Sequence, residues 1–108
     1  MKKIILTLML CLFAQLNYTI EFTQEQQLSI TRLFNISTAF LAQQIDTADT
    51  VIHLAEISPH LLHTPFHRAA ENMISALVNI FEGHLTIEQA EQAIHQEIVS
   101  VYHIPYHL

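Results

Sequence analysis

The sequence predicts an all-α protein: a small antiparallel three-helix bundle with a long first helix, preceded by an N-terminal signal segment. Apolar residues after position 20 recur at the 3.6-residue period of a helix, and helix-boundary residues separate the periodic stretches. Strand signals are scarce, because no Asn-Gly or Asp-Gly turn separates runs of alternating polarity. The 108 residues are 51% hydrophobic with one Gly and three Pro, which is typical of a folded chain. We expect one helical domain over residues 20–108.

Residues 1–19 have the layout of a secretory signal peptide. Lys2 and Lys3 precede an apolar run over residues 4–14, which is shorter than the roughly 20 residues that a transmembrane helix needs. Cleavage is predicted near position 14 or near position 19, and an uncleaved N-terminal anchor is the alternative. Cys11, the only cysteine, lies in this segment, so cleavage leaves no disulfide. We expect a secreted or periplasmic protein with no transmembrane span in its mature chain.

The first helix of the mature chain is predicted to begin after Thr23. Thr23 and Gln26 have the spacing of a capping box. The apolar residues that follow stay within about 140° of arc if the helix is continuous. We therefore expect one helix over residues 24–57, able to bend at the weak helix formers of residues 46–50 and ending before Pro59. The residues in phase are Ile30, Leu33, Phe34, Phe40, Leu41, Ile45, Ala48, Val51, Ile52 and Ala55.

The clearest helix covers residues 64–83, and both of its ends are marked. Thr64 can cap it and Pro65 suits its first position, while Gly83 can adopt the left-handed conformation that closes a helix. Apolar residues cover about half of its circumference, so other helices must bury that face. The predicted central layer consists of Phe66, Met73, Ile74, Leu77 and Phe81.

A short connector and a last helix complete the predicted bundle. Leu61 and Leu62, in the connector over residues 59–63, are expected beneath the bundle. The last helix is predicted over residues 87–102, because Thr86 and Gln89 repeat the capping-box spacing. Its apolar face is predicted to consist of Ile87, Ala90, Ile94, Ile98, Val101 and Tyr102.

The charge balance excludes several classes of partner. Removal of the signal leaves Arg32 and Arg68 against ten Asp and Glu residues, a formal charge of −8. Nucleic acids and acidic membranes are recognised by clustered Lys and Arg, which this chain lacks. We therefore expect no nucleic-acid partner.

Eight histidines are the unusual feature of the composition, and the first candidate site lies around the connector and the start of the helix that follows it. His60, His63, His67 and Glu71 could hold Zn²⁺ or Cu²⁺, since the positive end of a helix dipole favours the neutral imidazole that binds metals. Closed zinc sites usually have paired Cys or His ligands that are more closely spaced in the sequence. Ordinary surface and capping histidines are therefore the competing interpretation.

Two further constellations place carboxylates beside imidazoles. Asp46, Asp49, His53 and Glu56 share one stripe at metal-ligand spacing, although that stripe lies opposite the apolar arc, where a solvated charged face is expected. On the last helix, Glu91 projects inside the apolar face one turn before His95. Glu91 is therefore expected either to pair with His95, Arg32 or Arg68, or to line a cleft.

The sequence favours a non-enzymatic exported protein that acts by protein–protein interaction, as an inhibitor, adaptor or accessory factor. It has no Gly-rich phosphate loop and no mature Cys nucleophile. The partner is another protein or a second copy of the chain. A His-dependent metal-binding or pH-responsive protein is the alternative, and no cofactor other than Zn²⁺ or Cu²⁺ is considered.

A small exported helical enzyme of chorismate-mutase-like architecture is the second alternative. Such enzymes share the size and the long first helix. A dicarboxylate substrate, however, needs several Arg or Lys side chains in its pocket, and the mature chain offers only Arg32 and Arg68. This alternative is therefore disfavoured.

Overall fold

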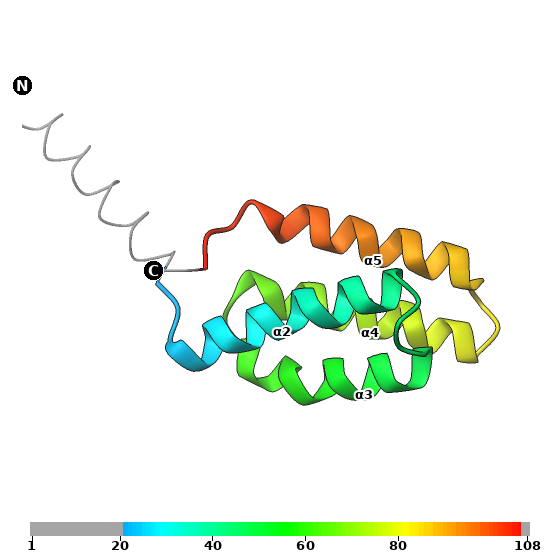
Figure 1. The fold of residues 1–108 in the computed structure, drawn as a ribbon, viewed down its shortest axis with the longest axis horizontal. Helices are drawn as coiled ribbons and strands as arrows, with labels where there is room; N and C mark the ends of the chain where they lie inside the picture. Colours follow the sequence, from blue (N-terminus) through cyan, green and yellow to red (C-terminus); the bar gives the residue numbers. More distant parts are fainter. Residues whose placement is uncertain (1–20, 107–108) are drawn as a thin grey trace, which may run out of the picture.

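The computed structural model describes residues 21–106, and every regular element in that range is helical (Figure 1). The all-α prediction is confirmed, but the described residues form four α-helices rather than three. The elements in chain order are α2 (Gln24–Leu41), α3 (Thr47–Ile57), the 3₁₀ turn η1 (Ser58–Leu61), α4 (Pro65–Phe81) and α5 (Ile87–Tyr102).

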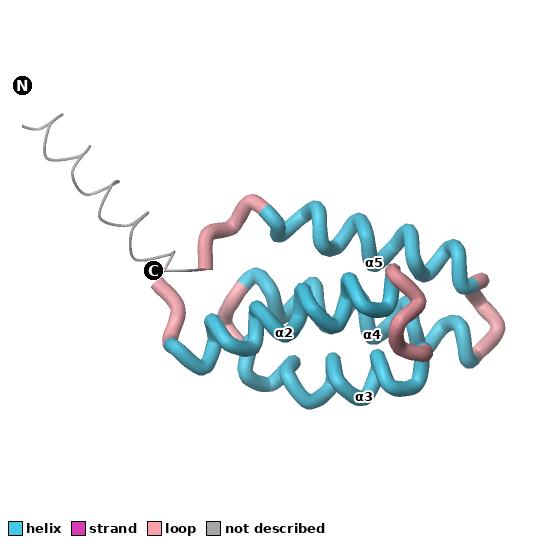
Figure 2. The backbone as a smooth tube through the Cα atoms, in the orientation of Figure 1, coloured by secondary structure: helices cyan, strands magenta, loops and turns pink. Residues whose placement is uncertain are grey.

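The four helices form two antiparallel hairpins, α2–α3 and α4–α5, which pack against each other (Figure 2). α2 contacts α3 and α5, and α4 contacts the same two helices, so the core lies between all four. Successive helices run in opposite directions, which gives an up-down-up-down bundle. The turns at α2–α3 and α4–α5 lie at one end of this bundle, and η1 lies at the other end.

The predicted continuous helix over residues 24–57 is wrong, because the chain reverses between Leu41 and Thr47. Gln43 adopts a left-handed φ of 60°, and the Gln44 amide donates to the Ala39 carbonyl at 2.8 Å, which closes the end of α2. Asp46 then begins α3, since its Oδ1 accepts a 2.7 Å hydrogen bond from the Asp49 amide. The stretch expected to bend a helix therefore starts a new one.

The buried face of α3 is not the one that continues the apolar phase of α2. Ala48, Ile52 and Ala55, which continue the phase of α2, are exposed. The face of α3 that packs into the bundle carries Leu54 and Ile57 instead. In a hairpin each helix turns its own stripe to the core, so apolar residues that agree in phase across the turn do not require one helix.

The second hairpin uses the same turn geometry as the first. Gly83, with φ 77°, occupies the place of Gln43, and the His84 amide donates to the Asn79 carbonyl at 2.9 Å. Thr86 occupies the place of Asp46 and forms the predicted capping box with Gln89. The capping box of Thr23 with Gln26 is also present, whereas Thr64 makes no side-chain cap and donates its hydroxyl to the Leu61 carbonyl.

This turn geometry predicts opposite effects for two glycine exchanges. Gln43→Gly should raise the free energy of unfolding by about 1 kcal/mol, because a left-handed φ costs glycine nothing. Gly83→Ala should lower the free energy of unfolding by about 1 kcal/mol. An added Cβ there meets no atom within 4 Å, so the loss would come only from the strain of a left-handed φ in alanine. Urea unfolding of the full chain measures both values. A loss of stability in Gln43→Gly would indicate a continuous helix.

The core draws residues from every helix, and most of the predicted central layer lies in it. Phe66, Met73 and Leu77 are at most 1% exposed, and Ile74 is half-buried. Phe81 is 62% exposed, so its place in the layer was wrong: it ends α4, beside the turn, where no helix covers it. The other buried apolar residues include Ile30, Leu33, Leu54, Ile57, Leu61 and Ile94.

Several smaller predictions about burial need correction. In the connector Leu61 is buried but Leu62 is 47% exposed. On α5 the face toward the core carries Ala90, Ile94 and Val101, while Ile87 and Tyr102 at the two ends of the helix are exposed. Ile87 and Tyr102 are the first and last residues of α5, and the bundle leaves both of them exposed.

Four aromatic rings join the two ends of the described chain at the η1 end of the bundle. Phe66 makes edge-to-face contacts with Phe22, Phe34 and Tyr106, at centroid distances of 5.8 to 6.1 Å. Tyr106 also stacks on Phe34 at 5.7 Å. The segment after α5 is therefore packed on the bundle as far as Tyr106.

The predicted signal peptide over residues 1–19 lies outside the described residues. Among residues 21–106 no helix has both the length and the apolar character needed to cross a membrane.

Candidate functional site

The first candidate constellation lies beside a small groove between η1 and α4. This connector groove has a volume of about 290 Å³ and is lined by Ala55, Ser58, Pro59, Leu62, His67, Glu71 and Ile74. His67 and Glu71 are one turn apart on α4, and His67 Nε2 lies 3.5 Å from Glu71 Oε1. The same Oε1 accepts a 2.7 Å hydrogen bond from Ser58 Oγ. Glu71 thus ties the start of η1 to α4.

The structure separates the other two predicted ligands from this groove. His60, on η1, places its Nδ1 2.7 Å from Glu25 Oε1 at the start of α2. His63 has a left-handed φ of 68°, turns the chain into α4 and is exposed. Within residues 21–106 no three His, Cys, Asp or Glu side chains are placed to hold one metal ion. The structure brings together His67 and Glu71, but not the predicted set of four.

A metal site at the connector stays a prediction from the sequence, with a direct test. If it forms, micromolar Zn²⁺ or Cu²⁺ must raise the melting temperature of the full chain, because a ligand that binds only the folded state stabilises it. The variant carrying His63→Ala and His67→Ala must lose that rise. The matched control is His84→Ala with His95→Ala, which removes two imidazoles elsewhere. An unchanged melting temperature in wild type contradicts the site.

The second predicted set, Asp46, Asp49, His53 and Glu56, is exposed along α3 and divides into two structural roles. Asp46 caps α3 through the Asp49 amide. Glu56 Oε2 lies 3.7 Å from Arg32 Nη2 on α2 and 3.9 Å from His53 Nδ1. Exposed pairs of this kind contribute little to stability.

Two arrangements of reactive groups can be compared directly with what catalysis requires. Ser58 donates its hydroxyl to Glu71 and not to an imidazole, whereas an activated serine donates to a histidine base. Arg32 and Arg68 line different grooves, one between α2 and α3 and one between α4 and α5. They therefore do not converge on one anionic substrate, as a chorismate-mutase-like pocket would require.

A larger hollow lies between the end of α2 and residues 88–96 of α5. This α2–α5 groove has a volume of about 530 Å³ and is lined by Leu41, Glu88, Glu91, Gln92, His95 and Gln96. A second hollow of about 390 Å³, the turn groove, is lined by Phe40, Gln43, Gln44, Ile45, Asp46, Thr47, Ile87 and Glu91. Glu91 lines both, so the two grooves adjoin.

Of the two positions that the sequence allowed for Glu91, the structure shows the second, in the wall of a cleft. It is half-buried in the wall of both grooves, and in residues 21–106 it forms no ion pair or hydrogen bond with His95, Arg32 or Arg68. A carboxylate inside an apolar face was the signal that identified it. Sequence reasoning missed Leu41 and Ile45 as groove residues, because a continuous helix would have placed them with the core.

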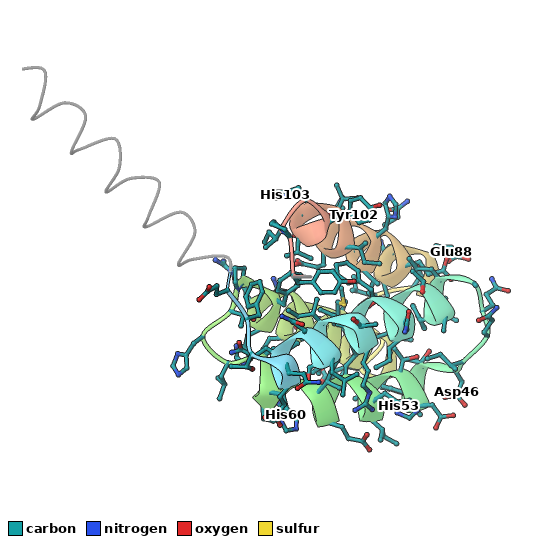
Figure 3. The ribbon with its side chains drawn as sticks, turned by 60° about the vertical axis from the view of Figure 1, so that its left-hand side comes forward. Asp46, His53, His60, Glu88, Tyr102 and His103 are labelled. Carbon is teal, nitrogen blue, oxygen red and sulfur yellow. The ribbon has the colours of Figure 1, made fainter. Side chains whose placement is uncertain are left out.

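α5 also presents one line of exposed side chains along its length. The α5 stripe consists of Glu88, Gln92, His95, Val99 and Tyr102, spaced four, three, four and three residues apart, so all five project from one face. Figure 3 labels Glu88 and Tyr102, which belong to the two ends of α5. Val99 and Tyr102, 58% and 78% exposed, make the stripe apolar at its C-terminal end.

Comparison with known proteins gives no match: no family model fits the chain, and neither the curated proteins nor the solved structures include one similar to it.

Proposed function

We propose that this chain is an exported, non-enzymatic helical protein that acts by binding another protein along α5. The observation that supports this most is the α5 stripe, in which Val99 and Tyr102 hold large apolar side chains in solvent one turn apart. Tyr and other aromatic residues are typical anchors of protein interfaces, because they bury much area with little loss of conformational freedom.

The α2–α5 groove makes this surface concave next to the stripe. The α2–α5 groove is open, and Leu41 forms an apolar wall opposite the polar residues of α5. Glu88, Gln92 and His95 of the stripe also line this groove, so a partner that entered the groove while covering Val99 and Tyr102 would lie along one continuous face of α5. The export part of the proposal comes from the residues before position 20, which carry the signal-peptide pattern.

The test is affinity capture by the full chain from the exported fraction of its source, compared among three versions. The first is wild type, and the second carries Val99→Ser with Tyr102→Ser. The matched control carries Leu28→Ser with Ile52→Ser, which are 63% and 53% exposed on α2 and α3. We expect a protein retained by wild type and by the control but lost from the α5 variant.

Equal melting temperatures of the three versions would show that folding does not explain the difference. If no protein distinguishes the α5 variant from the control, binding along α5 is contradicted. If the chain alone sediments as a dimer that only the α5 variant disrupts, the partner is a second copy of the chain.

A further inference from the structure

We propose that the α2–α5 groove and the adjoining turn groove bind a cationic amphipathic helix of the partner protein. This inference rests on the proposed function and names the chemistry of the segment that α5 recognises. It follows from the charge of the groove walls, their apolar positions and the length of the surface.

The walls carry negative charge without a fixed positive charge. Glu88 and Glu91 line the α2–α5 groove, and Asp46 lines the turn groove with Glu91. Neither groove is lined by Lys or Arg, and His95 is the single imidazole among their lining residues. Arg32 and Arg68 lie in two other grooves. A cationic segment is therefore attracted, while phosphates and acidic lipids are repelled.

Apolar side chains lie directly beside these carboxylates. Leu41 lines the first groove, and Phe40, Ile45 and Ile87 line the second, with Ile87 52% exposed. A small cation could use the carboxylates but not this apolar wall, and no three His, Cys, Asp or Glu side chains in residues 21–106 are placed around one ion. The combination fits a segment with apolar residues on one side and Lys or Arg on the other.

The surface has the length of a helix of several turns. α5 has 16 residues, so it extends about 24 Å and can run beside a partner helix of similar length. A helix lying there would place its apolar anchors against Leu41 and Ile87, and its cations near Glu88 and Glu91. A second copy of this chain is a poorer occupant, because the described residues carry ten acidic side chains and only two arginines.

The test uses the full chain and a synthetic peptide of about 18 residues that forms an amphipathic helix with Leu on one face and Lys on the other. The control peptides are a scrambled sequence of the same composition and a version with Glu in place of every Lys. We expect one amphipathic Lys peptide bound per chain, weaker binding of the scrambled peptide, and affinity that falls steeply at about 0.5 M salt. Equal binding of the acidic peptide would overturn the proposal.

Matched charge variants locate the binding surface. Glu88→Gln with Glu91→Gln should weaken peptide binding about tenfold, because both side chains line the groove. Glu21→Gln with Glu56→Gln removes the same total charge from exposed positions outside both grooves and should change the affinity less than about twofold. Melting temperatures of both variants report folding. Equal weakening by the two variants would show attraction to net charge alone and would overturn the groove assignment.

Zero-length cross-linking identifies the occupant, because a carbodiimide joins lysine amines to carboxylates. The chain has only Lys2 and Lys3, so links from peptide lysines to Asp46, Glu88 or Glu91 would support the proposal. Links from Lys2 or Lys3 to these carboxylates would show that the chain's own first residues fill the groove, which would overturn it. If the peptide fails to bind while capture along α5 succeeds, the partner chemistry is wrong and the proposed function stands.

Discussion

Phe66→Ala should lower the free energy of unfolding by about 3 to 5 kcal/mol. Phe66 is fully buried and is the ring on which Phe22, Phe34 and Tyr106 meet, so its removal leaves a cavity and ends three aromatic contacts. Chemical denaturation of the full chain measures the loss. Phe66→Leu keeps most of the apolar volume and should recover much of the stability. A loss below about 1 kcal/mol for Phe66→Ala would contradict the central position of this ring.

Leu77→Ala should lower the free energy of unfolding by about 2 to 5 kcal/mol, because Leu77 is fully buried in the C-terminal half of α4. The matched control is Phe81→Ala on the same helix. Phe81 is 62% exposed, so its truncation should change stability by about 0.5 kcal/mol or less. Urea denaturation compares the two directly. If Phe81→Ala costs as much as Leu77→Ala, the exposed end of α4 is misplaced.

The termini of three helices could be predicted from the sequence because their signals are local. Thr23 with Gln26 and Thr86 with Gln89 form the expected capping boxes. Gly83 closes α4 with the expected left-handed φ. A side-chain oxygen three residues from an amide, or a residue without a Cβ, acts through neighbours in the chain. Such signals do not depend on tertiary packing.

The reversal after α2 could not be predicted because its left-handed residue is Gln43 rather than glycine. Asp46 was visible as a poor helix former, but its role as a cap appears only once the chain has turned. Because this turn was not predicted, α2 and α3 were expected to form one helix, and the wrong face of α3 was expected to be buried. A periodic pattern records the spacing of apolar residues, not whether the chain folds back between them.

In the candidate site, too, the features with a local signal in the sequence were predicted and those that depend on tertiary packing were not. Glu91 was found because a carboxylate within an apolar stripe is a local anomaly. The predicted histidine set was not assembled, because His60 reaches Glu25 on another helix and His63 lies at the reversal before α4. The α2–α5 groove depends on which helices become neighbours. That information lies in the tertiary arrangement and not in any one segment.

Binding along α5 is tested most directly by mapping the backbone amide shifts in ¹H–¹⁵N spectra of the full chain as the captured partner protein is added. We expect the perturbed residues to gather on α5, from Glu88 to Tyr102, and in the turn from Leu41 to Asp46 between α2 and α3. Perturbations confined to the connector groove and the outer face of α3, with α5 unchanged, would contradict binding along α5.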